Sequence, residues 1–291
     1  MQSVISAMPL PRTQLRILRA AHLGMCFGVR DAITLALEES SRQPLTILGE
    51  LVHNESVLND LRERGIGLEV NVAAVRTNTV MITAHGASEK AMEQARAHAP
   101  HLLDATCPLV HVAHRAVRQL VQQGYHPIVI GKAGHVEVRG LTEDLQEFDI
   151  VLTEADLDRL TERPRYGVAA QTTQPIEKVR HLVRMLRERF PRSEVRFVDT
   201  VCQPTKQRQA AAVELAQQSD IVIVIGGQNS NNTHELAATC QTYCPRVHHV
   251  QRANDLRAEW FEGAETIGIT AGTSTPDWII DSVEQWLKVN L

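Results

Sequence analysis

The stretch Asp104-Ala-Thr-Cys107-Pro-Leu109 follows a short apolar run and precedes a helical pattern that covers residues 108–123. The same order of apolar run, cysteine and helical pattern recurs at His22-Leu-Gly-Met-Cys26-Phe-Gly28 and at Asp199-Thr-Val-Cys202-Gln-Pro-Thr205. The cysteines stand 81 and 95 residues apart, so each repeat is as long as a small domain. The sequence therefore predicts three similar units, each marked by one cysteine.

Apolar runs and helical patterns alternate along the chain, which is the βαβ rhythm of a parallel sheet. Runs typical of strands lie at residues 15–20, 45–48, 80–83, 102–105, 128–130, 150–152, 166–170, 195–198, 221–225 and 266–270. Helical patterns lie at residues 29–40, 54–64, 88–98, 108–123, 176–190, 205–218, 232–243 and 276–288. We therefore expect an α/β fold of three parallel-sheet domains, at residues 15–100, 101–193 and 194–291, after an N-terminal lead of residues 1–14.

The composition excludes several classes of protein. Of the 291 residues, 43% are hydrophobic and 22% are charged, as in ordinary globular chains and unlike disordered or fibrous ones. Lys and Arg number 30 against 34 Asp and Glu, a net charge of −4, and no basic run would follow a nucleic-acid backbone. No window approaches 18 consecutive apolar residues, and the N-terminal residues lack the apolar stretch of a secretion signal. We expect a cytoplasmic protein with neither a nucleic-acid nor a membrane partner.

The three repeated cysteines stand where ligands bind in parallel α/β sheets, beyond the carboxyl ends of strands. If the units face one another around a pseudo-threefold axis, Cys26, Cys107 and Cys202 meet at one point. Three thiolates leave a tetrahedral ion or a four-iron cluster one ligand short, which is typical of catalytic rather than structural sites. Thiolates suit iron–sulfur clusters, zinc or copper(I), and the pattern alone leaves these open. Cys240 and Cys244 lack this context, and we expect them either to pack in the core or to occupy incidental surface positions.

Polar side chains follow the other apolar runs of each unit and predict an anion site. Three histidines lie at these ends, beside serines and asparagines that are neutral hydrogen-bond donors or acceptors. The group consists of His53, His85, His135, Ser230, Asn231, Asn232 and Ser274. Several charge-assisted hydrogen bonds from such a wall can hold a diphosphate without an arginine clamp.

Glu137 lies two residues after His135, and on an extended loop both side chains point the same way. A carboxylate close to an anionic centre has its pKa raised, which favours a protonated acid that can deliver a proton. The hydroxyl of Thr172 or Thr173 is placed to relay that proton. We therefore expect Glu137, His135 and Thr172 to be the catalytic residues.

Nine segments, in order, resemble one known family. They are Gly24-Met-Cys-Phe-Gly-Val29, Leu51-Val-His-Asn54, Ala84-His-Gly86, Asp104-Ala-Thr-Cys-Pro-Leu-Val110, Gly131-Lys-Ala-Gly-His-Val-Glu-Val138, Gln171-Thr-Thr173, Cys202-Gln-Pro-Thr-Lys-Gln-Arg-Gln209, Asn229-Ser-Asn-Asn-Thr233 and Thr270-Ala-Gly-Thr-Ser-Thr-Pro-Asp277. They extend over residues 15–280, nearly the whole chain. Through these nine segments the sequence resembles the LytB/IspH family of 4-hydroxy-3-methylbut-2-enyl diphosphate reductases.

The resemblance implies a fold, a cofactor and a reaction. It implies three α/β domains around a central [4Fe–4S] cluster held by Cys26, Cys107 and Cys202, with one iron open to the substrate hydroxyl. It implies that His135 contacts the substrate and that Glu137 with Thr172 supplies the proton. The residues that it implies for the diphosphate are His53, His85, Ser230, Asn232 and Ser274. It also implies electrons from ferredoxin or flavodoxin and formation of isopentenyl and dimethylallyl diphosphate, the last step of the non-mevalonate isoprenoid pathway.

The sequence departs from the family pattern at a few positions, and two other functions remain open. Many members have serine where Asn231 stands and alanine where Pro204 stands, and an amide can still donate to a phosphate. A zinc enzyme that uses the three cysteines is one alternative, and it would be colourless where an iron–sulfur protein is brown. A cluster-bearing sensor is the other, but binding alone needs no proton relay such as Glu137 and Thr172.

Overall fold

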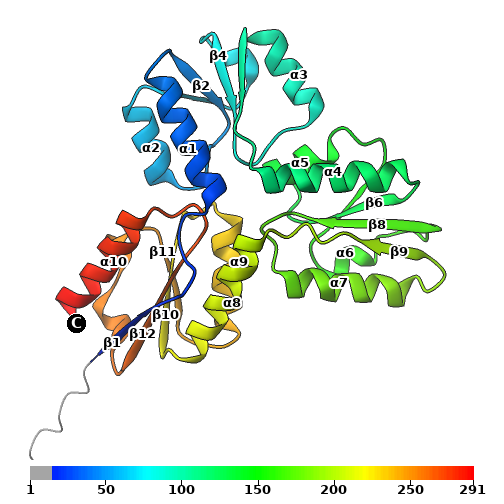
Figure 1. The fold of residues 1–291 in the computed structure, drawn as a ribbon. Helices are drawn as coiled ribbons and strands as arrows, with labels where there is room; N and C mark the ends of the chain where they lie inside the picture. Colours follow the sequence, from blue (N-terminus) through cyan, green and yellow to red (C-terminus); the bar gives the residue numbers. More distant parts are fainter. Residues whose placement is uncertain (1–14) are drawn as a thin grey trace, which may run out of the picture.

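The computed structural model describes residues 15–291, and the expected N-terminal lead, residues 1–14, lies outside the described residues. The chain forms three four-stranded sheets, each flanked by helices, which surround a common centre (Figure 1). Every strand pair is parallel. The expected architecture of three parallel-sheet α/β units around one centre is confirmed.

The first unit carries the sheet order β3-β2-β4-β5. Its strands are β2 (Leu45–Leu48), β3 (Gly67–Glu69), β4 (Thr79–Ile82) and β5 (His101–Asp104), and its helices are α1 (Phe27–Ser40), α2 (Glu55–Glu63) and α3 (Glu89–His98). Asn54 starts α2, because its side chain accepts the free N–H groups of Ser56 and Val57. Leu45, Ile47 and Met81 are fully buried between the sheet and these helices.

The second unit repeats this plan with the order β7-β6-β8-β9. Its strands are β6 (His126–Ile130), β7 (Asp149–Val151), β8 (Arg165–Ala170) and β9 (Glu194–Phe197), and its helices are α4 (Pro108–Gln122), α5 (Val136–Thr142), α6 (Glu154–Leu157) and α7 (Ile176–Arg189). Pro108 opens α4 at a position where its missing N–H costs no hydrogen bond.

The third unit has the order β1-β12-β10-β11. Its strands are β1 (Arg16–Arg19), β10 (Ile221–Ile225), β11 (Val247–Val250) and β12 (Thr266–Ala271), and its helices are α8 (Gln203–Gln217), α9 (Asn231–Gln241) and α10 (Asp277–Asn290). Short 3-10 turns lie at 253–255 and 258–261 in this unit and at 72–74 in the first. Cys240 and Cys244 are buried in this unit, as expected.

Strand pairing divides the chain differently from the expected borders. Strand β1 lies beside β12 in the third unit, not in the first, with Arg16 opposite Thr266 (Figure 1). Strand β5 completes the first sheet and β9 the second, so borders at 100/101 and 193/194 each fall one strand too early. The physical reason is that each cysteine loop is the connection between two units. The strand before a cysteine belongs to one sheet, and the helix after it packs in the next unit.

Two strands and two helices have no counterpart in the expected elements. Strands β3 and β11 are edge strands of three and four residues, and β11 contains His248 and His249, so neither has the apolar run that identifies a central strand. Helix α6 spans only four residues. Helix α5 matters more, because it covers residues that we expected to be an extended loop.

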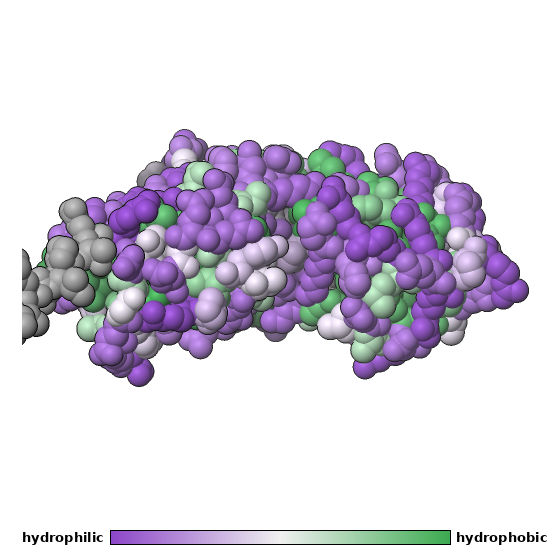
Figure 2. Space-filling model, turned by 90° about the horizontal axis from the view of Figure 1, so that it is seen from below, coloured by the Kyte–Doolittle hydropathy of each residue, from purple (hydrophilic) through white to green (hydrophobic). Residues whose placement is uncertain are grey.

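In the view of Figure 2 the molecule is elongated, and the visible face is mostly hydrophilic with scattered apolar areas. In residues 15–291, no helix combines the length and the hydrophobicity needed to cross a bilayer.

Candidate functional site

The three cysteines occupy equivalent places in the three units. Cys26, Cys107 and Cys202 are the N-cap residues of α1, α4 and α8. Each cysteine donates its backbone N–H to a carbonyl just after a strand: to Thr273 after β12 at 3.1 Å, to Ala84 after β4 at 3.0 Å and to Thr172 after β8 at 2.9 Å. All three therefore lie at carboxyl ends of strands, as expected.

The cysteines of neighbouring units lie close together. A Cβ atom on Gly28 would come within 2.5 Å of Cys107 Sγ, so the first turn of α1 leaves room for this sulfur only because residue 28 is glycine. Burial raises the pKa of Cys107 and raises that of Cys202 to about 11, and charge on Cys26 adds to both effects. These two thiols stay protonated at neutral pH unless a cation compensates the thiolates.

A cluster of three histidines joins the first and second units. The ring centroids of His53 and His85 are 4.7 Å apart, and that of His135 lies 5.3 and 5.6 Å from them. Burial lowers the pKa of His135 to about 4 and that of His85 well below its usual value, with charge on His53 a further cause for both. His53 Nε2 and His85 Nδ1 are buried without a hydrogen-bond partner. His85 and His135 are therefore neutral imidazoles at pH 7, and His53, whose Nδ1 lies 2.8 Å from a carboxyl oxygen of Glu50, keeps its Nε2 without a partner.

The third unit completes the polar wall. Ser230 caps α9 by accepting the N–H of Thr233, and the next two residues, Asn231 and Asn232, begin the helix with their Nδ2 atoms buried and unpartnered. Ser274 Oγ donates to the carbonyl of His53 at 3.4 Å, which links the third unit to the first.

A small cavity of about 40 Å³ lies within this wall. Its lining is His53, His85, His135, Ser230, Asn231, Asn232, Ser274, Thr173, Thr273, Val29 and Val52. The seven residues expected to form an anion site are therefore brought together in one place. The two valines were not expected there, and their only sequence signal is that they stand close to Cys26 and His53 in the chain.

Glu137 is buried at the start of α5, with 1% of its surface exposed. One carboxyl oxygen accepts the N–H of Thr172 at 2.6 Å, and the other is 3.0 Å from the hydroxyl of Thr172. Burial raises the pKa of Glu137 to about 7, and these hydrogen bonds limit the rise. The carboxyl group is therefore partly protonated at neutral pH.

The extended loop expected at Gly-His-Val-Glu-Val is wrong. His135 is the N-cap of α5 and accepts the N–H of Glu137 on its Nδ1 atom at 3.1 Å. Burial of Val138 and Leu141 against the sheet favours the helix over the extended form that alternating valines indicate. His135 and Glu137 still lie at the same end of α5, so both belong to the site.

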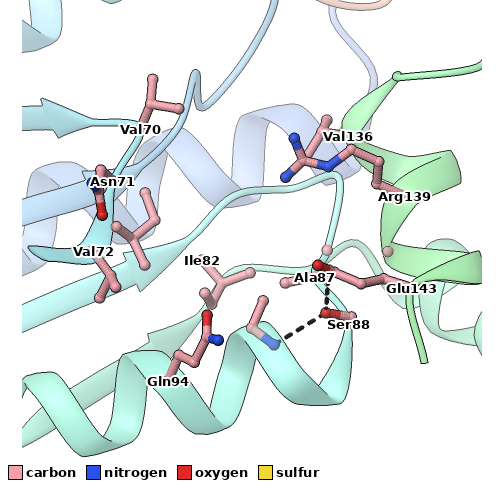
Figure 3. Close-up of a pocket in the computed structure, with 14 residues that line it drawn as sticks. Val70, Asn71, Val72, Ile82, Ala87, Ser88, Gln94, Val136, Arg139 and Glu143 are labelled. Atoms are coloured by element: carbon pink, nitrogen blue, oxygen red, sulfur yellow. Dashed lines mark hydrogen bonds between the residues drawn. The ribbon is translucent and has the colours of Figure 1, made fainter.

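A second cavity, of about 310 Å³, lies between the first and second units (Figure 3). Val136, Arg139 and Glu143 line it from α5. At its edge Ser88, the N-cap of α3, donates to Glu143 at 2.6 Å, and Asp144 accepts the N–H groups of Glu89 and Lys90 at 2.7 and 3.2 Å. This contact ties α5 to α3, and no sequence motif indicated it.

The chain is similar in sequence to known proteins over most of its length. The family model described as LytB protein matches residues 17–288. This chain belongs to the LytB family. Among curated LytB-family relatives, 4-hydroxy-3-methylbut-2-enyl diphosphate reductase of Trichlorobacter lovleyi is 39% identical over 92% of this chain and 96% of its own length. The enzyme of the same name from Geotalea daltonii is also 39% identical, over 94% of this chain and 97% of its own.

Two solved structures of the LytB family have the same fold. The E-1-hydroxy-2-methyl-but-2-enyl-4-diphosphate reductase of Plasmodium falciparum superposes with a TM-score of 0.87 at 26% identity, over 95% of this chain and 88% of that one. A structure of (E)-4-hydroxy-3-methyl-but-2-enyl diphosphate reductase, described as the terminal enzyme of the non-mevalonate pathway, gives 0.66 at 34% identity, over 95% and 100%.

Proposed function

We propose that this LytB-family protein is a 4-hydroxy-3-methylbut-2-enyl diphosphate reductase. It replaces the substrate hydroxyl with hydrogen, using two electrons and two protons and releasing water, and so forms isopentenyl and dimethylallyl diphosphate, the last step of the non-mevalonate pathway. The observation that carries the proposal is the buried carboxyl of Glu137, with a pKa of about 7, in a centre that also holds three cysteines and an anion-binding wall.

The cysteines suit a [4Fe–4S] cluster better than a single zinc ion. In residues 15–291, the group of three or more His, Cys, Asp or Glu residues whose ligand atoms all lie within 4.8 Å of one another is His53, His85 and His135. The three cysteine sulfurs do not form such a group, so at least one distance between them is longer. Sulfur ligands of one tetrahedral zinc lie only about 4 Å apart, given Zn–S bonds of about 2.3 Å. We infer that Cys26, Cys107 and Cys202 hold a cluster with one iron free of protein ligands. When bound, such a cluster supplies electrons and an iron that can meet the substrate hydroxyl.

The polar wall is the proposed diphosphate site. His53, His85, Ser230, Asn231, Asn232 and Ser274 supply its donors, and the unpartnered nitrogens among them are a strong argument, because buried polar groups are normally satisfied. A diphosphate that accepts hydrogen bonds from the amides of Asn231 and Asn232, and from the histidine nitrogens where these carry a proton, supplies the missing partners. Asn231 keeps a donor where many family members have serine. Pro204 lies in the first turn of α8, where proline is compatible with the helix.

Glu137 is the proposed acid. Its protonated carboxyl is held by Thr172, whose hydroxyl can pass the proton to the leaving hydroxyl group, which then departs as water. His135, the N-cap residue of α5, lies against His53 and His85 in the histidine cluster and is placed to contact the substrate. The chain offers no second redox cofactor motif, so the electrons come from ferredoxin or flavodoxin. The free state of all five cysteines agrees with a reaction in the reducing cytoplasm.

The test is an anaerobic assay with reduced methyl viologen and 4-hydroxy-3-methylbut-2-enyl diphosphate, beside iron and sulfide counts on the same sample. We expect four irons per chain, rapid dye oxidation and both isoprenyl diphosphates. A colourless protein with one zinc ion overturns the cluster. A full cluster without turnover overturns the reductase and favours a sensor.

A further inference from the structure

Arg208 is a buried cation beside the cysteines that none of the roles above uses. It lies on α8, six residues after Cys202, with 9% of its surface exposed. Its Nε donates to the carbonyl of Gly24 at 2.9 Å and its Nη1 to the carbonyl of Pro204 at 3.1 Å. Gly24 precedes Cys26 by two residues, so this guanidinium connects the helix of one cysteine to the loop of another.

The guanidinium has no carboxylate partner among the described residues. The charged or titratable groups that act on it are the sulfurs of Cys26 and Cys202, which favour its charge, and Arg30, which opposes it. Burial lowers the pKa of Arg208, but a guanidinium stays protonated in proteins. A buried charge without a counter-ion destabilises the folded chain. The buried guanidinium of Arg208 therefore favours an anion bound beside it.

We propose that Arg208 is the fixed counter-charge of the iron–sulfur cluster and raises its reduction potential. The inference rests on the proposed function, because that function supplies the cluster. Each reduction step adds one electron, taken from the external donor, and no proton moves at Arg208. A permanent cation in a poorly hydrated site stabilises the added negative charge. The reduced cluster would therefore gain more electrostatic stabilisation than the oxidised cluster.

Arg30 provides a matched control. It is also an arginine beside the loop of Cys26, and its Nε donates to the carbonyl of Met25 at 3.3 Å. Its side chain, however, is 52% exposed and pairs with Asp277 at 3.1 Å. Solvent and this carboxylate screen its charge. Loss of Arg30 therefore removes a comparable contact without removing a buried charge.

The experiment compares the reduction potentials of anaerobically reconstituted holoprotein and its R208Q, R208K and R30Q variants. Mediated dithionite titration is followed by absorbance and electron paramagnetic resonance, with iron and sulfide counted in each sample. For R208Q we expect at least a tenfold loss in the equilibrium constant for reduction, about 59 mV more negative for one electron. R208K and R30Q are expected to stay close to wild type.

Each outcome decides the inference. R208Q with four irons and the wild-type potential overturns it. If R208Q does not hold the cluster but R208K holds it at the wild-type potential, the charge is required and the inference stands. If R208K fails as well, the two carbonyl contacts are the function of Arg208, and the inference is wrong.

The wild-type sample separates this inference from the proposed function. A wild-type cluster that does not turn over the substrate overturns the reductase, while the potentials of the variants still measure the effect of Arg208. A wild-type protein that binds no cluster overturns both.

Discussion

Glu137 carries the proton chemistry of the proposed reaction, and replacing it tests that role directly. Glu137→Gln keeps the size of the side chain and a partner for Thr172, but removes the acidic proton. We expect turnover to fall by about 10²- to 10⁴-fold, with four irons still bound, because general acids contribute rate accelerations of that order. Dye-oxidation kinetics and iron counts measure the two effects. Unchanged turnover in Glu137→Gln would remove this residue from the mechanism.

The raised pKa of Glu137 also predicts how the stability of the apoprotein depends on pH. Its pKa is about 7 in the folded chain against an ordinary 4.5, so the folded state prefers the proton. The neutral carboxyl is fully favourable below about pH 4.5, and that advantage is lost as the pH rises through 7. The whole change is about 3 kcal/mol, from 1.36 kcal/mol for each tenfold change in proton affinity.

The measurement is urea unfolding of wild-type apoprotein and Glu137→Gln between pH 5 and 8.5. We expect the variant to gain stability relative to wild type across this range. His135, whose pKa burial lowers from 6.5 to about 4, changes the stability of both proteins with pH below 6.5, and its contribution cancels in the difference between them. A constant difference between the two proteins at all pH values contradicts the assignment.

At the scale of elements, helix α5 couples the site to the contact between two units. Its first residue follows His135, and the residues just after its end bind the start of α3 through Glu143 and Asp144. The carboxylate of Asp144 also lies where the positive end of the α3 dipole favours negative charge. A shift of α3 against α5 therefore moves His135 relative to His85.

This coupling predicts that Asp144→Ala raises the KM for the diphosphate substrate. We also expect a stability loss of about 1 kcal/mol, as for other lost helix caps. Asp156→Ala is the matched control, because Asp156 accepts the N–H groups of Leu152 and Thr153 in the same unit. It should cost similar stability and leave KM unchanged. Equal KM values for the two variants would show that the contact between α5 and α3 has no part in binding.

Much of the site was predictable at this scale because it follows local patterns. A cysteine between an apolar run and a helical pattern predicts its own place at a strand end. Pairing between distant strands was not predictable, because nothing near Arg16 indicates that its partner is Thr266. Arg208 was missed for a similar reason. Its neighbours in the chain indicate an ordinary helical arginine. Its burial without a carboxylate depends on the contact with the carbonyl of Gly24, which is distant in sequence.

For the whole molecule, the proposed ligands Cys26, Cys107 and Cys202 come from the loops that connect all three units, so we expect cluster and stability to be lost together. Cys107→Ser is expected to bind little iron, and its thermal unfolding midpoint should fall to that of iron-free wild type, because a cofactor that binds only the folded chain stabilises it. Iron counts and anaerobic thermal unfolding measure both. Cys240→Ser, in the core of the third unit, should lower the midpoint and keep the iron. Full iron in Cys107→Ser would mean that the cysteines do not hold the cluster.

The pairing of β1 with β12 has a consequence for synthesis. As the chain leaves the ribosome, the first and second units have all of their strands before β10, β11 and β12 of the third unit are made, and domains generally fold from the N-terminus. Strand β1 must wait some 250 residues for its neighbour, and the carbonyl that receives the N–H of Cys26 belongs to Thr273. A growing chain therefore cannot hold all three sulfurs in place, and the proposed cluster can be completed only when translation is nearly finished.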